Sequence, residues 1–561
     1  MTALDQVMVR GDQTLDAPVI THFRQVLVWP VHLQPLQNIK SPKQNLWELL
    51  AEAGAHNPWR EVEDEFTGDP TQFHERHYSE FVAFLPPVQR FLYGDGLGRS
   101  QHQKVWESPI KVMRRTDISR VRVLLDATAT PIDLQIAHID LYFFADIDVA
   151  MLALEVHADT LPLAVAQALM FKLGRAYPAY WDSGHAGHCP WRVEWLSATG
   201  DVLAASDYQD RSKFLTFACE HRAPRVASHW EYLLEPMVPH HSDKKGSLRY
   251  RQLEYYRMPF MAYLAVDRPE RLTRADHVRL GLGTEPGSSG ELPFSEQYLS
   301  RFEQDHCYDR HHGVQMERSW KGARFMSSGH ALVVTGPAAS KFFADVEHGA
   351  LGMFRHQYFL LFLIAHFHKA ALLMFSDRLA GAVSRLKVGD ARATLAFRNS
   401  MRAAHEVFLR FTHRYWFHEV SNHEQSRHLF DLCRRHLGLD RLYQDVRQEV
   451  RDMTEYLDNE AVRRQQESMM RLTVVTTFGL IGTVATGFLG MNIFSHSEEP
   501  TAMKLTIFAI VLVLAVLLTF YTLRKARRLS DFLEALTDDE LGMRGKVRAF
   551  WNIWWRKPDS A

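Results

Sequence analysis

A short polar segment near the C-terminus carries the residues with the most specific chemistry. It reads GFLGMNIFSHSEEP, runs from Gly487 to Pro500 and lies between two long apolar runs. Asn492 offers an amide oxygen, and Glu498 and Glu499 offer carboxylates. A divalent ion such as Mg²⁺ prefers oxygen ligands and sheds water reluctantly, so amide oxygens can bind it through its first water shell. Carboxylates near such a site raise the local cation concentration by Coulomb attraction.

Each of these residues also has a plainer interpretation. Asn492 can end a helix, because asparagine tolerates the left-handed conformation. Glu498 and Glu499 can belong to a solvated loop. His496 in the same segment would favour a transition metal over Mg²⁺.

The two flanking apolar runs are long enough to cross a membrane. Residues 472–489 and 505–523 contain no charged side chain. A helix of about 18 residues, at ~1.5 Å per residue, nearly spans a hydrocarbon core of ~30 Å. The alternative is a pair of buried helices in a large soluble core. Basic residues flank the pair on its outer sides and predict that both termini are cytoplasmic: Arg463, Arg464, Arg471, Arg524, Lys525, Arg527 and Arg528.

The first run is predicted to continue a long helix that begins near Asp440. Apolar residues recur at three- and four-residue spacing from Leu442 to Ala461. No Gly or Pro interrupts the chain between Asp440 and Gly479. This predicts one helix of about 50 residues, roughly 75 Å long. The first run is rich in Thr and Gly, which suits either close helix packing or a wall that contacts water.

Three further helices are predicted upstream of that one. They cover residues 352–386, residues 391–420 and a segment that starts with a capping box at Ser421 and Glu424 and ends at Gly438. Within the first, the apolar stretch YFLLFLIAHFHKAALLMF is interrupted by two histidines and Lys369. It is therefore too short to span a membrane, and we expect a helix buried in the soluble part.

Residues 1–345 have mixed patterns typical of a folded α/β or α+β domain. Strands are predicted at residues 25–33, 120–125, 138–156 and 191–197, with a helix at 161–177 between the last two. Lys and Arg total 65 against 66 Asp and Glu, which gives no signal for a nucleic acid polymer as partner. The four cysteines are scattered without a spacing motif, which favours a reducing compartment. The first 20 residues lack the apolar core of a secretory signal, so none is expected.

Two histidine- and cysteine-containing stretches are weaker candidates for metal sites. HAGHC holds His185, His188 and Cys189, and HCYDRHH holds His306, Cys307, Asp309, His311 and His312. These ligand types suit zinc, but neither stretch has paired Cys-x-x-Cys spacing. No phosphate-binding loop or catalytic motif is present, so we expect no enzyme activity.

The tripeptide Gly490-Met491-Asn492, at the end of the first of two C-terminal spans and after a long helix, resembles the CorA superfamily of divalent-cation channels and transporters. The resemblance implies an oligomeric funnel: an α+β cytoplasmic domain, a stalk helix and a two-helix transmembrane hairpin. The expected divisions are 1–345 (enlarged α/β domain), 346–438 (helical region), 439–490 (stalk helix continuous with the first span, from about 472), 491–503 (external loop), 504–523 (second span) and 524–561 (basic cytoplasmic tail).

The resemblance also assigns roles to particular residues. Gly490, Met491 and Asn492 form the selectivity motif, with Asn492 binding the hydrated ion and the loop acids Glu498 and Glu499 concentrating cations. Counting back from Asn492, the pore-lining residues are Gly487, Thr483, Leu480, Thr476, Leu472 and Met469. Glu455 corresponds to an acid of a regulatory metal site in the stalk, with a solvated helix face as the alternative. Leu489 before the glycine and IFSHSEEP after the asparagine depart from the usual family pattern and leave the ion open.

The implied function is passive divalent-cation conduction across a bacterial-type inner membrane by a homo-oligomer, most simply a pentamer. Mg²⁺ is the first expectation for the ion, and Zn²⁺, Co²⁺ and Ni²⁺ remain open. No tightly bound cofactor is expected beyond the transported or regulatory divalent ion, and the other partner is the lipid bilayer. The alternative is a ligand-gated CorA-like membrane effector whose enlarged cytoplasmic domain senses a small, nucleotide-type messenger. A structural membrane tether without conduction is the third hypothesis.

Overall fold

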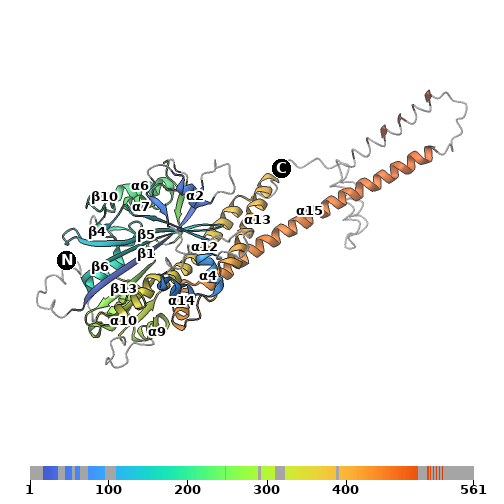
Figure 1. Cartoon of the computed structure of the whole chain (residues 1–561). Helices are drawn as coiled ribbons and strands as arrows, with labels where there is room; N and C mark the ends of the chain where they lie inside the picture. Colours follow the sequence, from blue (N-terminus) through green and yellow to red (C-terminus); the bar gives the residue numbers. More distant parts are fainter. Residues whose placement is uncertain are drawn as a thin grey trace. The chain divides into compact units, whose positions relative to one another are not determined.

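The computed structural model describes residues 17–35, 45–53, 57–62, 74–94, 109–182, 185–244, 246, 248–254, 256–287, 292, 294–309, 322–386, 391–490 and scattered positions from 502 to 521. The chain divides into two compact units, Met1–Val450 and Arg451–Ala561, called unit 1 and unit 2 below. Figure 1 shows a large sheet with helices around it in unit 1. The boundary between the units lies within residues 439–490, the predicted stalk helix.

Within the described residues, unit 1 is built on a 14-stranded, mostly antiparallel sheet with the main order β10-β9-β4-β5-β6-β1-β13-β16-β15-β14. β2 and β3 pair on the β5 side, and β11 and β12 pair beside β1. A separate hairpin is formed by β7 and β8. The strands are β1 (Val19–Pro35), β2 (Trp59–Glu61), β3 (Ile110–Arg115), β4 (Arg120–Leu124), β5 (Ile132–Phe144), β6 (Ile147–Pro162), β7 (Trp181–Asp182), β8 (His185–Ala186), β9 (Arg192–Leu196), β10 (Val202–Ala205), β11 (Val238–Pro239), β12 (Leu248–Gln252), β13 (Phe260–Val266), β14 (Cys307–Tyr308), β15 (Arg324–Ser327) and β16 (Ala331–Pro337).

The stretch predicted as a strand at residues 138–156 is a hairpin of two strands, β5 and β6. The chain turns between Phe144 and Ile147, where Asp146 adopts a left-handed backbone conformation with φ 66°. β6 is apolar almost throughout its first half because helices cover both faces of the central sheet. That continuous apolar run hides the turn from a pattern analysis.

The central strands are covered on both faces. On one face, Phe367 of α12 (Phe359–Ser384) stacks on Phe144 of β5, with ring centroids 3.8 Å apart. On the other, Trp29 of β1 contacts Trp230 of α7 (Ser228–Leu234). α5 (Leu163–Lys172) also packs on β1 and β6. Unit 1 therefore has three layers, with the core between sheet and helices.

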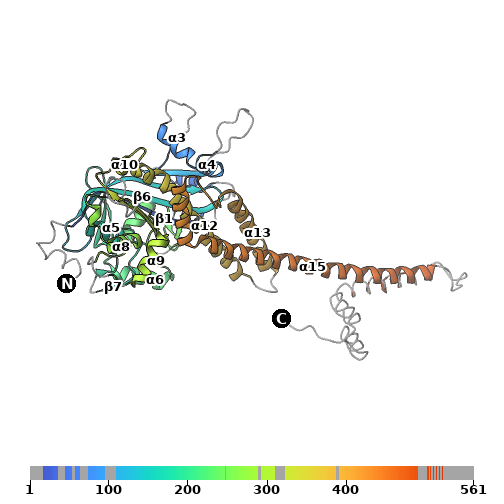
Figure 2. The same cartoon turned by 90° about the horizontal axis from the view of Figure 1, so that it is seen from below.

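The remaining helices of the first 350 residues lie around this sheet. In Figure 2, α3 and α4 lie on the opposite side of unit 1 from α6 and β7. These helices are α2 (Leu46–Ala51), α3 (Glu75–Val82), α4 (Pro86–Tyr93), α6 (Arg211–His221), α8 (Arg274–Leu282), α9 (Glu296–His306), α10 (Lys341–Ala344) and the short η1 (Pro269–Arg271).

The apolar helix at residues 350–384 is continuous but irregular. α11 (Ala350–Met353) passes through a π-helical turn, η2 (Phe354–Tyr358), into α12. Among the described residues, it is the helix that is long and apolar enough to cross a membrane. However, 78% of its apolar window is buried within the fold, with His366 and His368 in the core. The prediction of a buried helix is confirmed.

The next helices lead to the stalk. They are α13 (Ala391–Arg414), α14 (Glu424–Leu437) and α15 (Leu439–Gly490), a single helix of 52 residues. The predicted capping box at Ser421 and Glu424 is wrong, because His423 occupies the N-cap position of α14. Ser421 instead donates its hydroxyl proton to the carbonyl of Ala83, far away in the sequence.

Candidate functional site

The predicted pore-lining residues share one narrow side of α15. They are Met469, Leu472, Thr476, Leu480, Thr483 and Gly487, and Gly490 of the selectivity motif continues the row. At 3.6 residues per turn these seven positions fall within an arc of about 80°. We call these seven residues the exposed stripe, since each is exposed in the structure.

Apolar side chains of α15 differ in exposure, and polar positions outside the stripe, such as Arg471 and Thr477, are exposed as well. Leu472 is 65% exposed and Leu480 66%, whereas Val474, about 160° away from the centre of the stripe, is 2% exposed. Leaving such apolar area in water costs ~25 cal/mol per Å². A row of apolar and small residues that the described part of the chain does not cover indicates a surface for lipid or for another chain.

The threonines of this helix have their hydroxyl protons already committed. Thr476 donates to the carbonyl of Leu472 at 3.0 Å, and Thr483 donates to that of Gly479 at 2.8 Å. Threonine commonly bonds the preceding helical turn in this way. The hydroxyl oxygens keep free lone pairs, so the stripe can accept hydrogen bonds from the water shell of an ion.

Four glycines without side chains lie in the C-terminal part of α15. A Cβ added to Gly479, Gly482, Gly487 or Gly490 would meet no described atom within 4 Å. Packing among the described residues of this chain therefore does not require them. Small residues at such positions allow helices of neighbouring chains to approach closely within a membrane.

Several predicted site residues lie outside the described residues. They are Met491 and Asn492 of the selectivity motif, Glu498 and Glu499 of the loop, and His496. For the predicted second span, the structure describes scattered helical positions such as Ile510, Leu514 and Leu517, all of them exposed. The predicted basic tail at residues 524–561 is also outside the described residues.

The possible metal sites predicted outside the two apolar runs are not assembled in the described residues. Glu455 is exposed on α15, and nowhere in the described part of the chain do three His, Cys, Asp or Glu side chains come together as a metal site. Burial raises the pKa of both the Cys189 and the Cys307 thiol to about 12, which keeps them protonated. Asp309 pairs with Arg324, and His311 and His312 lie outside the described residues.

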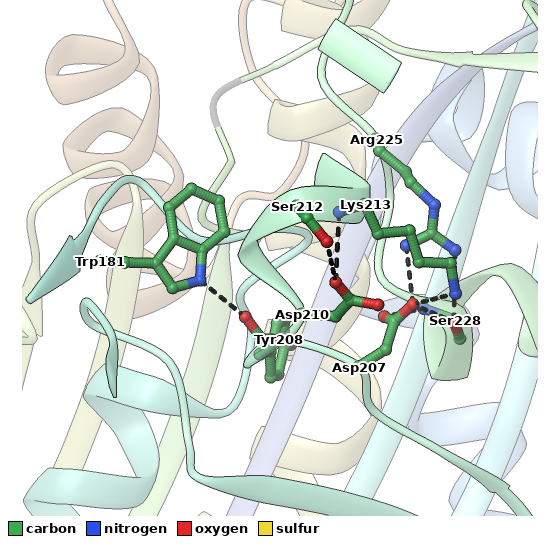
Figure 3. Close-up of polar contacts among 8 residues, drawn as sticks. All are labelled: Trp181, Asp207, Tyr208, Asp210, Ser212, Lys213, Arg225 and Ser228. Carbon is green, nitrogen blue, oxygen red and sulfur yellow. Dashed lines mark hydrogen bonds and ion pairs between the residues drawn. The ribbon is translucent and has the colours of Figure 1, made fainter. Parts of the chain in front are cut away.

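Sequence reasoning missed a polar network in unit 1 that Figure 3 shows. Asp207 accepts hydrogen bonds from the backbone and hydroxyl of Ser228, from Lys213 and from Arg225. Burial alone would raise the pKa of Asp207, but these hydrogen bonds and the charge of Arg225 outweigh burial and hold it far below its usual range. The network joins α6 to the start of α7, and no local motif announces it.

Comparison with known proteins bears on the C-terminal part of the chain. The family model described as "CorA-like Mg2+ transporter protein" matches residues 375–525, which include the exposed stripe and Asn492. No curated protein and no solved structure matches the chain. Residues 1–374, which contain every described strand of the unit 1 sheet, lie outside the match. Through residues 375–525, the chain is therefore similar to the CorA-like family.

Proposed function

We propose that this protein is a CorA-like channel or transporter that conducts divalent cations, with Mg²⁺ as the main ion, along the exposed stripe of α15. The match to the family over residues 375–525 supports a membrane protein for divalent cations rather than an enzyme. The observation that carries the proposal is the stripe itself: apolar, hydroxyl-bearing and glycine positions aligned on one uncovered side of a helix within the matched segment.

An oligomer explains why that side is left uncovered. Several copies around one axis would turn their stripes toward a common pore. We propose a homopentamer, which is the assembly that the family resemblance implies. The half-buried side of α15, with Val474, would face the rest of each subunit or the lipid bilayer. Glycines along the helix permit the close approach that such a bundle needs.

The chemistry of the stripe suits a hydrated ion. Rings of Leu472 and Leu480 would form dry constrictions that close the pore by dewetting. Threonine hydroxyls between them would accept hydrogen bonds from the water shell. At the mouth, Asn492 would bind the hydrated ion through its amide oxygens, and Glu498 and Glu499 would raise the local cation concentration.

The charge pattern of α15 supports an orientation in the inner membrane with both termini cytoplasmic. Arg463 pairs with Glu467 and Arg464 with Glu460 along the helix, and Arg471 is exposed before the uncharged run starts. Basic residues concentrate on cytoplasmic sides of membranes. Each elementary charge moved inward gains ~2.3 kcal/mol per 100 mV of potential, so conduction needs no nucleotide hydrolysis.

A second function is favoured by the size of unit 1. Every described strand of its sheet precedes the matched segment, so the ion path does not account for the sheet. We propose as the alternative that unit 1 gates the pore in response to a small ligand, making the protein a ligand-gated membrane effector. In either case no tightly bound cofactor is required, and the divalent ion is cargo or regulator.

Ion uptake into liposomes that contain the purified full-length protein tests the proposal. Mg²⁺, Zn²⁺, Co²⁺ and Ni²⁺ are compared under an inside-negative potential, with and without divalent ion on the cytoplasmic side. We expect Mg²⁺ uptake that rises with the potential and falls when the cytoplasmic side is loaded with Mg²⁺. Uptake of no divalent ion in any condition would show that the protein does not transport them.

A further inference from the structure

Basic side chains from distant parts of unit 1 meet at one place outside the segment matched by the family. Lys172 is the last residue of α5, and Arg175 follows that helix. His188 follows β8, Arg257 lies between β12 and β13, and His330 lies in the turn between β15 and β16. We call these five residues the basic cluster. Arg175 is buried, whereas Lys172, His188, Arg257 and His330 are half-buried, so a ligand can reach part of the cluster.

Aromatic rings hold the basic cluster together. Phe171 lies close to both guanidinium groups. Its ring centroid is 4.6 Å from Cζ of Arg175 and 5.6 Å from Cζ of Arg257. The Phe171 ring also contacts the ring of His188 at 5.2 Å. These contacts bring two guanidinium groups and one imidazole around a single phenyl ring.

Hydroxyl groups complete the surroundings of His188. Its Nδ1 is 3.2 Å from the hydroxyl of Tyr256, and its ring contacts that of Tyr180. Tyr180 is 49% exposed and offers an open aromatic face beside the cations. His188 itself has a left-handed backbone conformation, φ 64°, which a non-glycine residue holds only when its surroundings enforce it.

The two histidines of the cluster respond first to burial and second to the neighbouring cations. Burial and the charges of Arg175, Lys172 and Arg257 lower the pKa of His188, with exposed Glu285 as the opposing charge. Burial and the charges of Arg257 and Arg175 likewise lower the pKa of His330. Among the described residues, Nε2 of His330 is buried without a hydrogen-bond partner.

The backbone beneath the cluster is held firmly. The carbonyl of Arg175 accepts hydrogen bonds from the Tyr208 hydroxyl and from Nε1 of Trp230, at 2.5 and 2.7 Å. Figure 3 shows that Tyr208 also accepts, through its carbonyl, a hydrogen bond from Trp181, and that Asp207 beside it anchors α7. Arg257 is fixed in turn by donation to the carbonyl of Gly283. Preorganised cations of this kind bind an anion without first having to be ordered.

We propose that the basic cluster is a binding site for a small, multiply charged oxyanion of the phosphate type. Lys172, Arg257 and His188 come from three separate segments, and Nζ of Lys172 donates one proton to the carbonyl of Leu125 at 3.2 Å and keeps two for a ligand. Donors from separate segments suit a tetrahedral group better than a planar carboxylate. Binding such an anion would offset the cost of gathering cations in a partly buried place. The exposed ring of Tyr180 leaves room for an aromatic portion of the ligand to stack.

The turn that carries His330 connects the cluster to the start of the stalk. Gly329 has φ 77°, and a Cβ there would lie 2.8 Å from the backbone of His436 at the end of α14. The carbonyl of Gly329 is 3.1 Å from Nε2 of His366 on α12. α14 ends at Gly438, and α15 begins at Leu439. If the proposed function is correct, the anion therefore acts on the pore through this turn.

Calorimetric titration of the full-length protein in detergent tests the site at one fixed free Mg²⁺ concentration. The probes are tripolyphosphate, ATP, adenosine and citrate. We expect saturable binding of tripolyphosphate and ATP, no binding of adenosine, and binding of citrate at least tenfold weaker. Because each substitution removes one charge-assisted hydrogen bond to the anion, Lys172→Gln and Arg257→Gln should each weaken tripolyphosphate binding about tenfold or more. Lys172→Arg keeps the charge, so its affinity should stay within about threefold of the native value.

Lys341→Gln is the matched control, because Lys341 is exposed on α10 in the same unit. Thermal unfolding of each variant verifies that it is folded. If Arg257→Gln is unfolded, the test rests on the affinity of Lys172→Gln alone. The proposal is overturned if tripolyphosphate does not saturate the native protein, if citrate or adenosine binds equally well, or if Lys172→Gln weakens binding no more than Lys341→Gln. Binding without Mg²⁺ flux would contradict the proposed function and leave the site intact.

Discussion

At the scale of single residues, the threonines of the exposed stripe are the groups best suited to contact a hydrated ion. Thr476 and Thr483 give their protons to helix carbonyls and present oxygen lone pairs outward. An ion's water shell offers hydrogen-bond donors, so an acceptor is what the pore wall must supply. Their chemistry therefore fits ion passage without stripping the shell.

Replacing one of these hydroxyls should slow conduction without unfolding the helix. Thr483→Val keeps the side chain's shape and removes one acceptor worth ~0.5–1.5 kcal/mol, so Mg²⁺ flux should fall about two- to tenfold. Thr477→Val is the matched control, because Thr477 makes the same backbone hydrogen bond, to Thr473 at 2.8 Å, but lies outside the stripe. Equal loss of flux in the two variants would mean that position on the helix is irrelevant.

Asp207 is predicted to make unit 1 sensitive to acid. Because its pKa in the folded protein is held below its usual value, its contribution is complete above about pH 4 and is lost as the pH falls further. Asp207→Asn should cost ~2–3 kcal/mol of unfolding free energy at pH 7. The variant should also lose less stability than the native protein between pH 4 and its acid unfolding.

Urea unfolding followed by tryptophan fluorescence measures both effects. Asp210→Asn is the control, because exposed Asp210 caps α6 through the backbone of Lys213, and such a cap contributes ~1 kcal/mol. A native-like stability of Asp207→Asn at pH 7 would contradict the role given to the network. So would an unchanged dependence on pH.

At the scale of elements, the sequence predicted what depends on local pattern and missed what depends on distant contacts. The period of apolar residues and the lack of Gly or Pro predicted a long helix from Asp440, and α15 begins at Leu439. The capping box at Ser421 failed because that hydroxyl bonds Ala83, a partner that no local pattern contains. The β5–β6 turn was missed because apolar residues continue on its far side.

The same helix gives a prediction about the closed pore. Leu480→Ser would hydrate a constriction that closes by dewetting, so resting Mg²⁺ leak should rise severalfold. Leu514→Ser on the second predicted span is the control, since Leu514 is 62% exposed but not part of the stripe. Resting flux is measured in liposomes with Mg²⁺ on the cytoplasmic side. An unchanged leak in Leu480→Ser would remove Leu480 from the gate.

At the scale of the whole molecule, the two units differ in how far the sequence alone can describe them. The membrane-directed part was recognisable because its signal lies in about 50 consecutive residues, and the family match at residues 375–525 covers the same region. The basic cluster was not predictable, because its residues range from 172 to 330 and meet only through the sheet. The motif HAGHC pointed to His188 but suggested a metal rather than an anion.

The central claim is that the exposed stripe of α15 lines the ion path, and a thiol-accessibility scan tests it most directly. Exposed Cys219 is first replaced by serine, and single cysteines are then placed by Thr476→Cys, Thr483→Cys and Gly487→Cys on the stripe and by Val474→Cys and Phe478→Cys on the opposite side. Mg²⁺ uptake into liposomes is measured before and after a positively charged thiol reagent is added. The account predicts that the reagent blocks uptake by the three stripe variants and spares the other two, whereas block at Val474→Cys with free uptake in the stripe variants would contradict it.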